Sequence, residues 1–365
     1  MAELPWIEKY RPICINDLKQ SDNIINLFKK IIQSGSLTHY ILYGNPGTGK
    51  TSAILALGRE LFGEYYSDRV IEFNASDDRG IKAVREKITN VAKKSVHKII
   101  CNDGRIIPGF KIIVLDEADS MTSEAQDALR VIIEKYSSVT RFCFICNYIS
   151  KITDAIKSRC SSIHFNLINK SSMIETLNKI SVKESMILPI DVLDAIIDVS
   201  NGDMRRAIML LQNLKYKYDY IEGKKKSLIK MNANDLISVI PYGYPNSNKS
   251  EINIDDVYDL AASVSVNWTK KILKKISKIK NVIGIIRLCR DIFGTGIPID
   301  TILIQLHRTI LQTSTITEDK KIMIFQYNAP VFYNLKESCD GYIQLLSYIS
   351  CLHGIINNSP VFPKK

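Results

Sequence analysis

The chain has 365 residues, more than one hydrophobic core usually supports, so two or three domains are expected. Hydrophobic residues make up 45% of the sequence and charged residues 24%, the proportions of an ordinary globular protein and not of a disordered one. The formal charge is +11, with an isoelectric point near 9.1. This basic excess favours a polyanionic partner such as nucleic acid, with a merely basic solvated surface as the alternative.

The sequence shows no sign of a membrane or secretory role. Residues Met1 to Pro5 have neither a charged n-region nor an apolar h-region, and no apolar run reaches the roughly eighteen residues that span a bilayer. We therefore expect an intracellular chain with reduced thiols and no membrane partner. Among eight cysteines, Cys143 and Cys146 form the only close pair, and their apolar surroundings predict buried structural thiols.

The first part of the chain alternates strand and helix patterns. Strands are expected at 40–43, 70–73, 111–115 and 141–146. Helices are expected between them, at 22–33, 51–62, 81–94 and 123–136. This alternation is typical of a parallel, doubly wound α/β domain, here ending near Phe165.

The remainder of the chain has helical periodicity. Short helices are expected at 171–184, 190–200 and 203–214, followed by a Lys- and Tyr-rich linker or exposed turn at 215–230. Helices should resume from Ala233, interrupted by a loop at 241–250. The expected domains are therefore residues 1–165, 166–230 and 231–365.

A complete phosphate-loop motif, G-x-x-x-x-G-K-[ST], stands between an apolar strand and a helix. Its glycines allow backbone N–H groups to close around phosphates, Lys50 can reach the terminal phosphates, and the Thr51 hydroxyl can bind Mg²⁺. Strand, loop and helix agree, so we expect a nucleoside triphosphate and Mg²⁺ to bind here; the family resemblance given below implies that the nucleotide is ATP. The expected nucleotide-binding residues of this segment are Gly44, Asn45, Pro46, Gly47, Thr48, Gly49, Lys50, Thr51 and Ser52.

An apolar strand that ends in two acids supplies the second chemical feature. In the sequence Ile-Ile-Val-Leu-Asp-Glu-Ala-Asp at 112–119, Asp116 can hold the Mg²⁺ shell and Glu117 can orient and deprotonate the attacking water. Together with the phosphate loop, this motif describes a nucleotide hydrolase. By itself the motif is weak, because Asp-Glu-Ala-Asp also occurs in RNA helicases.

Four further segments distinguish between families. They are Pro5 to Pro12, Phe73 to Ile81, Ser158-Arg159-Cys160, and Gly202 to Ala207. Together they closely resemble the small subunits of replication factor C, the AAA+ sliding-clamp loader. The resemblance is dense over 4–214 and loose beyond. It implies an AAA+ P-loop domain, a small helical lid and an all-α C-terminal collar that oligomerises.

The resemblance also implies individual roles. Asn147 matches sensor 1, which helps to position the hydrolytic water, and Arg205 matches sensor 2, which reports the γ-phosphate to the lid. Arg159 matches the arginine finger, which acts on ATP bound by the neighbouring subunit. The residues implied at the adenine-binding hinge are Ile7, Tyr10 and Arg11.

Each of these roles has a simpler alternative. Asn147 could be a turn residue that ends a strand, and Arg159 a solvated surface arginine. Arg205 could exchange roles with Arg206, because adjacent helical residues point about 100° apart and only one can face the nucleotide. Trp6 could be a core aromatic residue.

Contacts with DNA and with the clamp are also implied. The expected DNA-phosphate contacts, which would not read sequence, are Arg79, Lys82 and Arg85, with Lys87 as a weaker fourth. The alternative is a solvated basic face. The family resemblance places the helix at 123–136 against the clamp, with candidate contacts Gln126, Arg130 and Glu134. Val131 replaces a basic residue that usually follows Arg130, which puts the coupling between nucleotide and DNA in doubt.

The sequence therefore predicts an ATPase subunit of a clamp loader that opens a sliding clamp and places it on primer-template DNA. Its expected partners are other loader subunits, in a hetero-oligomer that we take to be a pentamer, and its expected compartment is the nucleus. An archaeal cytosol and a cytoplasmic viral factory stay open. Two other functions remain as alternatives: a different AAA+ DNA-remodelling motor, and a scaffold subunit that binds nucleotide without turnover.

Overall fold

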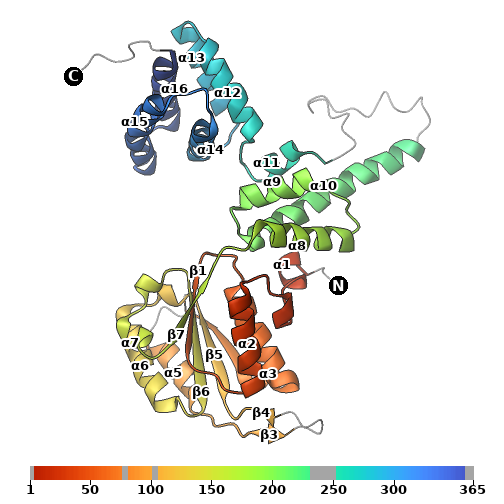
Figure 1. Ribbon diagram of the computed structural model, residues 1–365, viewed down its shortest axis with the longest axis vertical. Coiled ribbons are helices and arrows are strands. Elements are labelled where there is room, and N and C mark those ends of the chain that lie inside the picture. Colours follow the sequence, from red (N-terminus) through yellow and green to blue (C-terminus); the bar gives the residue numbers. More distant parts are fainter. Residues whose placement is uncertain (1–3, 76–80, 101–105, 231–251, 358–365) are drawn as a thin grey trace. The chain divides into compact units, whose positions relative to one another are not determined.

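The computed structural model describes residues 4–75, 81–100, 106–230 and 252–357 of the chain (Figure 1). It divides into two compact units, Met1–Tyr220 and Ile221–Lys365. The first unit contains the α/β domain, two following helices and the first part of a third, and the described part of the second contains helices alone.

A five-stranded parallel sheet forms the centre of the first unit. Its strands run in the order β2 (Val70–Asn74), β5 (Lys111–Asp116), β6 (Thr140–Cys146), β1 (Tyr40–Gly44) and β7 (Ser161–Phe165). The predicted strands are confirmed to within one residue at each end. The sequence prediction missed β7, because its Ser-Ser-Ile-His-Phe pattern and its exposed side chains are those of an edge strand.

Helices cover both faces of this sheet (Figure 1). On one side lie α2 (Asp22–Ser34) and α3 (Lys50–Phe62), packed against Leu42 and Val114. On the other side lie α5 (Ile81–Ala92) and α6 (Ser123–Tyr136), packed against Ile41 and Phe144. Successive strand residues therefore face two separate cores, which confirms the predicted doubly wound α/β domain.

Short elements connect these layers. They are α1 (Trp6–Lys9), α4 (Tyr66–Arg69), α7 (Asp154–Lys157), a hairpin of β3 (Ile99–Ile100) and β4 (Ile106–Ile107), and 3₁₀ turns at Ile15–Asp17, Gly63–Tyr65, Ala118–Ser120 and Ile149–Lys151. The paired cysteines of β6 are buried as predicted: Cys143 is 1% exposed and Cys146 is 2% exposed. Burial raises the pKa of Cys146 to about 11, so its thiol stays protonated and unreactive.

Three helices follow the sheet: α8 (Lys170–Lys183), α9 (Ile190–Ser200) and α10 (Met204–Lys230), which begins in the first unit and continues past its boundary at Tyr220. The prediction of a linker at 215–230 is wrong, because α10 continues through it. Lys and Tyr interrupt the apolar periodicity without breaking a helix, and an i,i+4 ion pair of 2.8 Å between Lys215 and Asp219 supports the helical backbone.

The second unit is helical throughout its described part. Its helices are α11 (Ile254–Leu260), α12 (Val266–Lys278), α13 (Val282–Phe293), α14 (Ile299–Gln312), α15 (Glu318–Lys336) and α16 (Gly341–Asn357). Leu303, Leu306 and Ile349 are completely buried at its centre. The loop predicted at 241–250 lies outside the described residues. Along the described chain, every helix is too short or too polar to cross a membrane.

A buried histidine in this unit should make its stability depend on pH. The Asn328 side-chain amide lies 2.9 Å from His307 Nδ1, and burial lowers the pKa of His307 from 6.5 to about 4. The folded state therefore binds fewer protons than the unfolded chain. We expect His307 to contribute fully above pH 6.5, and the free energy of unfolding to fall by up to about 3 kcal/mol between pH 6.5 and 4.

Denaturant unfolding of the full chain at pH 7 and pH 4.5 measures this loss. The His307→Leu variant has no titratable ring, so its stability should fall less over the same interval. Equal losses in the two proteins would show that His307 is not the group responsible.

Candidate nucleotide site

The phosphate loop surrounds a cavity of about 120 Å³ at the start of α3. Gly49 precedes the helix with φ +88°, a left-handed conformation that glycine adopts without a steric cost. The lining residues are Pro46, Gly47, Gly49, Lys50, Thr51, Ser52, Asp116, Glu117, Asp119, Ile145, Cys146, Asn147 and Arg205. The cavity thus lies where β1, β5 and β6 end, as expected for a ligand site in an open parallel sheet.

Lys50 is the buried cation of this cavity. Its side-chain nitrogen donates to the carbonyl oxygens of Gly44 and Asn45, each at 2.8 Å, and to Asn147 Oδ1 at 3.2 Å. Burial lowers the pKa of Lys50, and the nearby Asp116 carboxylate opposes that effect. Lys50 therefore contacts both the phosphate loop and the end of β6. In this position a phosphate oxygen could replace the carbonyl oxygens as the acceptor for its side-chain nitrogen.

Thr51 and Asp116 meet across the cavity. The Thr51 hydroxyl donates to Asp116 Oδ2 at 2.8 Å, although the two residues are far apart in the sequence. Described residues contain no group of three or more His, Cys, Asp or Glu side chains that could hold a metal ion. One carboxylate and one hydroxyl fit Mg²⁺, because Mg²⁺ keeps waters and substrate phosphates as its other ligands.

Glu117 follows Asp116 in a strained conformation. Its φ is 54°, in the left-handed region that few non-glycine residues adopt. Its N–H donates to Asp116 Oδ1 at 2.8 Å, and its carbonyl accepts from the Ser120 hydroxyl at 2.7 Å. These bonds offset the strain and direct the side chain of Glu117 into the lining of the cavity.

Asp119 connects the acidic turn to Asn147. Its Oδ2 accepts the backbone N–H groups of Asn147 at 3.2 Å and of Tyr148 at 3.3 Å. No role was predicted for Asp119 from the sequence. Its position, two residues beyond Glu117 in an acidic motif, was the available signal.

The lid helices contact the phosphate loop directly. Arg205 lines the cavity, whereas Arg206 does not and instead donates its backbone N–H to Asp203 Oδ1 at 3.1 Å. A Cβ atom at Gly47, where φ is +69°, would lie 1.7 Å from that same Asp203 oxygen.

Gln20 was also not predicted as a site residue. Its side-chain amide donates to the carbonyl oxygens of Thr48 at 2.9 Å and Asn166 at 3.0 Å.

The proposed hinge residues lie near the cavity without lining it. Arg11 Nε donates to Ser52 Oγ at 3.4 Å, and the Tyr10 hydroxyl donates to the Glu184 carboxylate after α8. Ile7 is half-buried, and Trp6 is a buried core residue. Gly44, Asn45 and Thr48 belong to the phosphate loop but do not line the cavity either.

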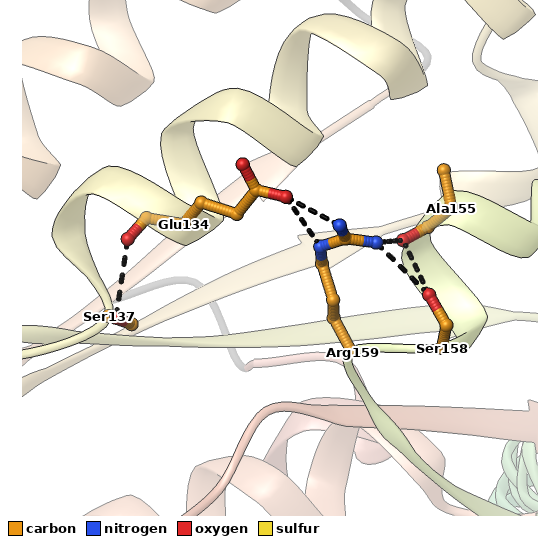
Figure 2. Close-up of polar contacts among 5 residues, drawn as sticks. All are labelled: Glu134, Ser137, Ala155, Ser158 and Arg159. Atoms are coloured by element: carbon orange, nitrogen blue, oxygen red, sulfur yellow. Dashed lines mark hydrogen bonds and ion pairs between the residues drawn. The ribbon is translucent and has the colours of Figure 1, made fainter.

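Arg159 and Lys50 lie at opposite ends of two neighbouring strands, with Arg159 before the start of β7 and Lys50 beyond the end of β1. Arg159 comes two residues before β7, which pairs in parallel with β1 from Ser161 opposite Tyr40 to Phe165 opposite Gly44. The length of β7, about 13 Å, therefore separates Arg159 from the strand end that carries the phosphate loop. Arg159 instead contacts Glu134 of α6 (Figure 2).

The residues predicted to contact DNA and the clamp differ in how far the structure describes them and in whether they are exposed. Arg79 lies outside the described residues, only the helical backbone is described at Lys82 and Arg85, and Lys87 is exposed on α5. Arg130 is exposed on α6, and Glu134 is engaged by Arg159.

Gln126 was predicted to contact the clamp, but the structure buries it. Its side chain is buried, and its amide donates to the Met121 and Lys151 carbonyls and accepts from the Thr153 N–H at 2.8 Å. A side chain with these internal bonds is not available on the surface for a partner.

Family models match three successive parts of the chain. Residues 40–168 match the ATPase family associated with various cellular activities (AAA), 175–215 match the RCF1/5-like AAA+ ATPase lid domain, and 265–351 match the replication factor C C-terminal domain. These matches confirm the predicted succession of P-loop domain, lid and helical C-terminal region.

Relatives match nearly the whole chain. A protein of Acanthamoeba polyphaga mimivirus, named as a replication factor C small subunit, is 52% identical over 96% of this chain and 97% of its own length. Replication factor C subunit 2 of Schizosaccharomyces pombe is 38% identical over 96% and 94%. Replication factor C subunit 4 of Homo sapiens is 36% identical over 94% and 86%. The chain therefore belongs to the replication factor C small-subunit family of AAA+ clamp-loader ATPases.

Proposed function

We propose that this chain binds ATP with Mg²⁺ in the described cavity and hydrolyses it to drive the loading of a sliding clamp onto primer-template DNA. The observation that carries this proposal is the convergence of Lys50, Thr51, Asp116, Glu117 and Asn147 on one cavity. Binding and hydrolysis need different groups, and the cavity contains both. A scaffold subunit that only binds nucleotide would not need Glu117 and Asn147 at this place.

The chemistry follows from the positions of the side chains. Lys50 and Arg205 would contact the terminal phosphates, and Thr51 with Asp116 would hold Mg²⁺. Bound Mg²⁺ would neutralise charge that develops on the phosphate oxygens. Glu117 would take a proton from the attacking water, and the side-chain amide of Asn147, whose backbone N–H donates to Asp119, would orient that water.

Assembly with other loader subunits follows from the position of Arg159. Arg159 lies at the start of β7, whereas the phosphate loop follows the end of the neighbouring strand β1, so we infer that Arg159 acts on ATP in a neighbouring subunit and not in its own site. We propose a heteropentamer, because the chain belongs to a family of loader subunits. We further propose the nucleus as its compartment, and fractionation of cells that express the tagged chain would distinguish it from a cytoplasmic viral factory.

DNA contact is proposed for the first turns of α5. Lys82 and Arg85 lie three residues apart on this helix and so share a face, with Arg79 preceding it. The strand that precedes α5, β2, pairs in parallel with β5, and its last residue Asn74 lies opposite Asp116. Such contacts would bind the phosphate backbone of any sequence.

The proposal predicts that ATP turnover by the assembled complex rises when clamp and primer-template DNA are both present, and rises less with either alone. A steady-state phosphate-release assay measures this response. The Lys82→Gln/Arg85→Gln variant is the matched control, because it should keep basal turnover and lose stimulation by DNA. Turnover that responds to DNA but never to the clamp would instead favour another AAA+ motor.

A further inference from the structure

The Arg159 guanidinium is held by four contacts within its own subunit (Figure 2). Its Nε donates to Glu134 Oε1 at 2.8 Å, and its Nη2 forms an ion pair with the same oxygen at 2.5 Å. Its Nη1 donates to the Ala155 carbonyl at 2.7 Å and to Ser158 Oγ at 3.0 Å. A guanidinium has five N–H donors, and three of them are engaged in these hydrogen bonds. A contact with a phosphate would also have to separate the guanidinium from its ion pair with Glu134.

Glu134 differs from the other partners of Arg159. Ala155 and Ser158 are close neighbours in the sequence and offer neutral oxygens, whereas Glu134 comes from α6, 25 positions earlier, and carries a negative charge. Within the described part of the chain it is the only charged partner of this guanidinium. Its carboxylate therefore offsets the positive charge that a finger would bring to a phosphate.

The position of Glu134 on α6 supports a role that depends on charge. An acid in the last turns of a helix lies near the negative end of the helix dipole, where it is unfavourable without a cation nearby. Arg159 supplies that cation. The side chains remain 33% and 49% exposed, so water screens the pair and a more highly charged anion could displace the carboxylate.

We propose that Glu134 is a positioning residue that holds Arg159 in a resting orientation, from which the arginine must exchange carboxylate for γ-phosphate before it assists hydrolysis in the neighbouring subunit. This inference rests on the proposed role of Arg159 as a finger in trans. It implies that Glu134 slows hydrolysis at the neighbour's site in the unstimulated complex. The effect is modest, because exposed ion pairs are weak.

The test uses the complex reconstituted with its partner subunits, with Lys50→Ala in this chain so that its own site is silent in every arm. Single-turnover ATP hydrolysis then reports the partner sites. Glu134→Gln keeps the shape of the side chain and removes its charge. We expect it to accelerate hydrolysis by about two- to fivefold at low salt, and the gain to shrink at high salt, which screens the pair in the unsubstituted complex.

A double-variant comparison isolates the pair. In an Arg159→Ala background, Glu134→Gln should have no effect, because the residue through which it acts is gone. The matched control is Asp154→Asn, which removes a nearby exposed carboxylate that pairs with Lys157 at 3.2 Å. It should leave the neighbour's site unchanged.

The possible failures are distinguishable. If Arg159→Ala does not slow the partner sites, the finger role fails, and the inference fails with it. If Arg159→Ala slows them while Glu134→Gln leaves hydrolysis unchanged or slows it, the finger stands and the positioning role of Glu134 is overturned. An acceleration that persists in the Arg159→Ala background would also overturn it. Thermal unfolding of each variant confirms that the comparison is made between folded proteins.

Discussion

Replacing Arg159 with alanine should slow ATP hydrolysis at the neighbouring subunit's site by roughly 10³-fold or more, the lower end of the effect of arginine fingers in GTPases. The reason is the loss of a positive charge beside the γ-phosphate, where negative charge accumulates in the transition state. Because Arg159 and Lys50 lie at opposite ends of the neighbouring strands β7 and β1, ATP binding in the subunit that carries Arg159→Ala should not change.

The measurement mixes Arg159→Ala subunits with partners that carry intact phosphate loops, and it follows nucleotide turnover at each site separately. Ser158→Ala is a useful control, because it removes one neutral contact of the guanidinium and keeps the charge. A loss confined to the mutant's own site would mean that Arg159 acts in cis, which contradicts the proposed interface.

The Glu117→Gln variant should retain ATP affinity while its turnover falls by roughly 10²-fold or more. Glutamine fits the same space and tolerates the same left-handed backbone about as well, but its amide cannot accept the proton of the attacking water. The phosphate-binding groups, Lys50 and Thr51, are unchanged. Equilibrium binding of a labelled nucleotide and phosphate release, measured on the same preparation, separate the two effects.

Glu124→Gln is the matched control for this variant. Glu124 is an exposed carboxylate in the first turn of α6 and does not line the cavity, so basal turnover should stay normal. Near-normal turnover in Glu117→Gln itself would remove Glu117 from the mechanism and would favour a subunit in which another group activates water.

The sequence predicted most accurately the features that are contiguous along the chain. The phosphate loop needs strand, turn and helix in succession, and all three appear between Tyr40 and Phe62. The buried strands were equally clear, because strands covered on both faces read as unbroken apolar runs. The edge strand β7 has no such signal.

Contacts between distant segments could not be predicted in this way. Gln126 looked like a surface residue of an amphipathic helix, and only the fold shows that the backbone at Lys151 and Thr153 satisfies its amide. The pairing of Glu134 with Arg159 joins a helix to a strand end, and nothing in either local sequence indicates it. The helix α10 was predicted to end before 215–230 for another reason. Polar residues in this segment interrupt the apolar periodicity, but they do not lower the helix propensity of the backbone.

The contact between Gly47 and Asp203 has a consequence for how the lid senses nucleotide. The Asp203 carboxylate lies against the Cα of Gly47 on one side and accepts the Arg206 N–H in the first turn of α10 on the other. A shift of the Gly47 peptide on phosphate binding would therefore push on the start of that helix without any help from a charged side chain. The phosphate loop would thus act on the lid by steric contact at Gly47, in addition to any effect of Arg205 on the phosphates.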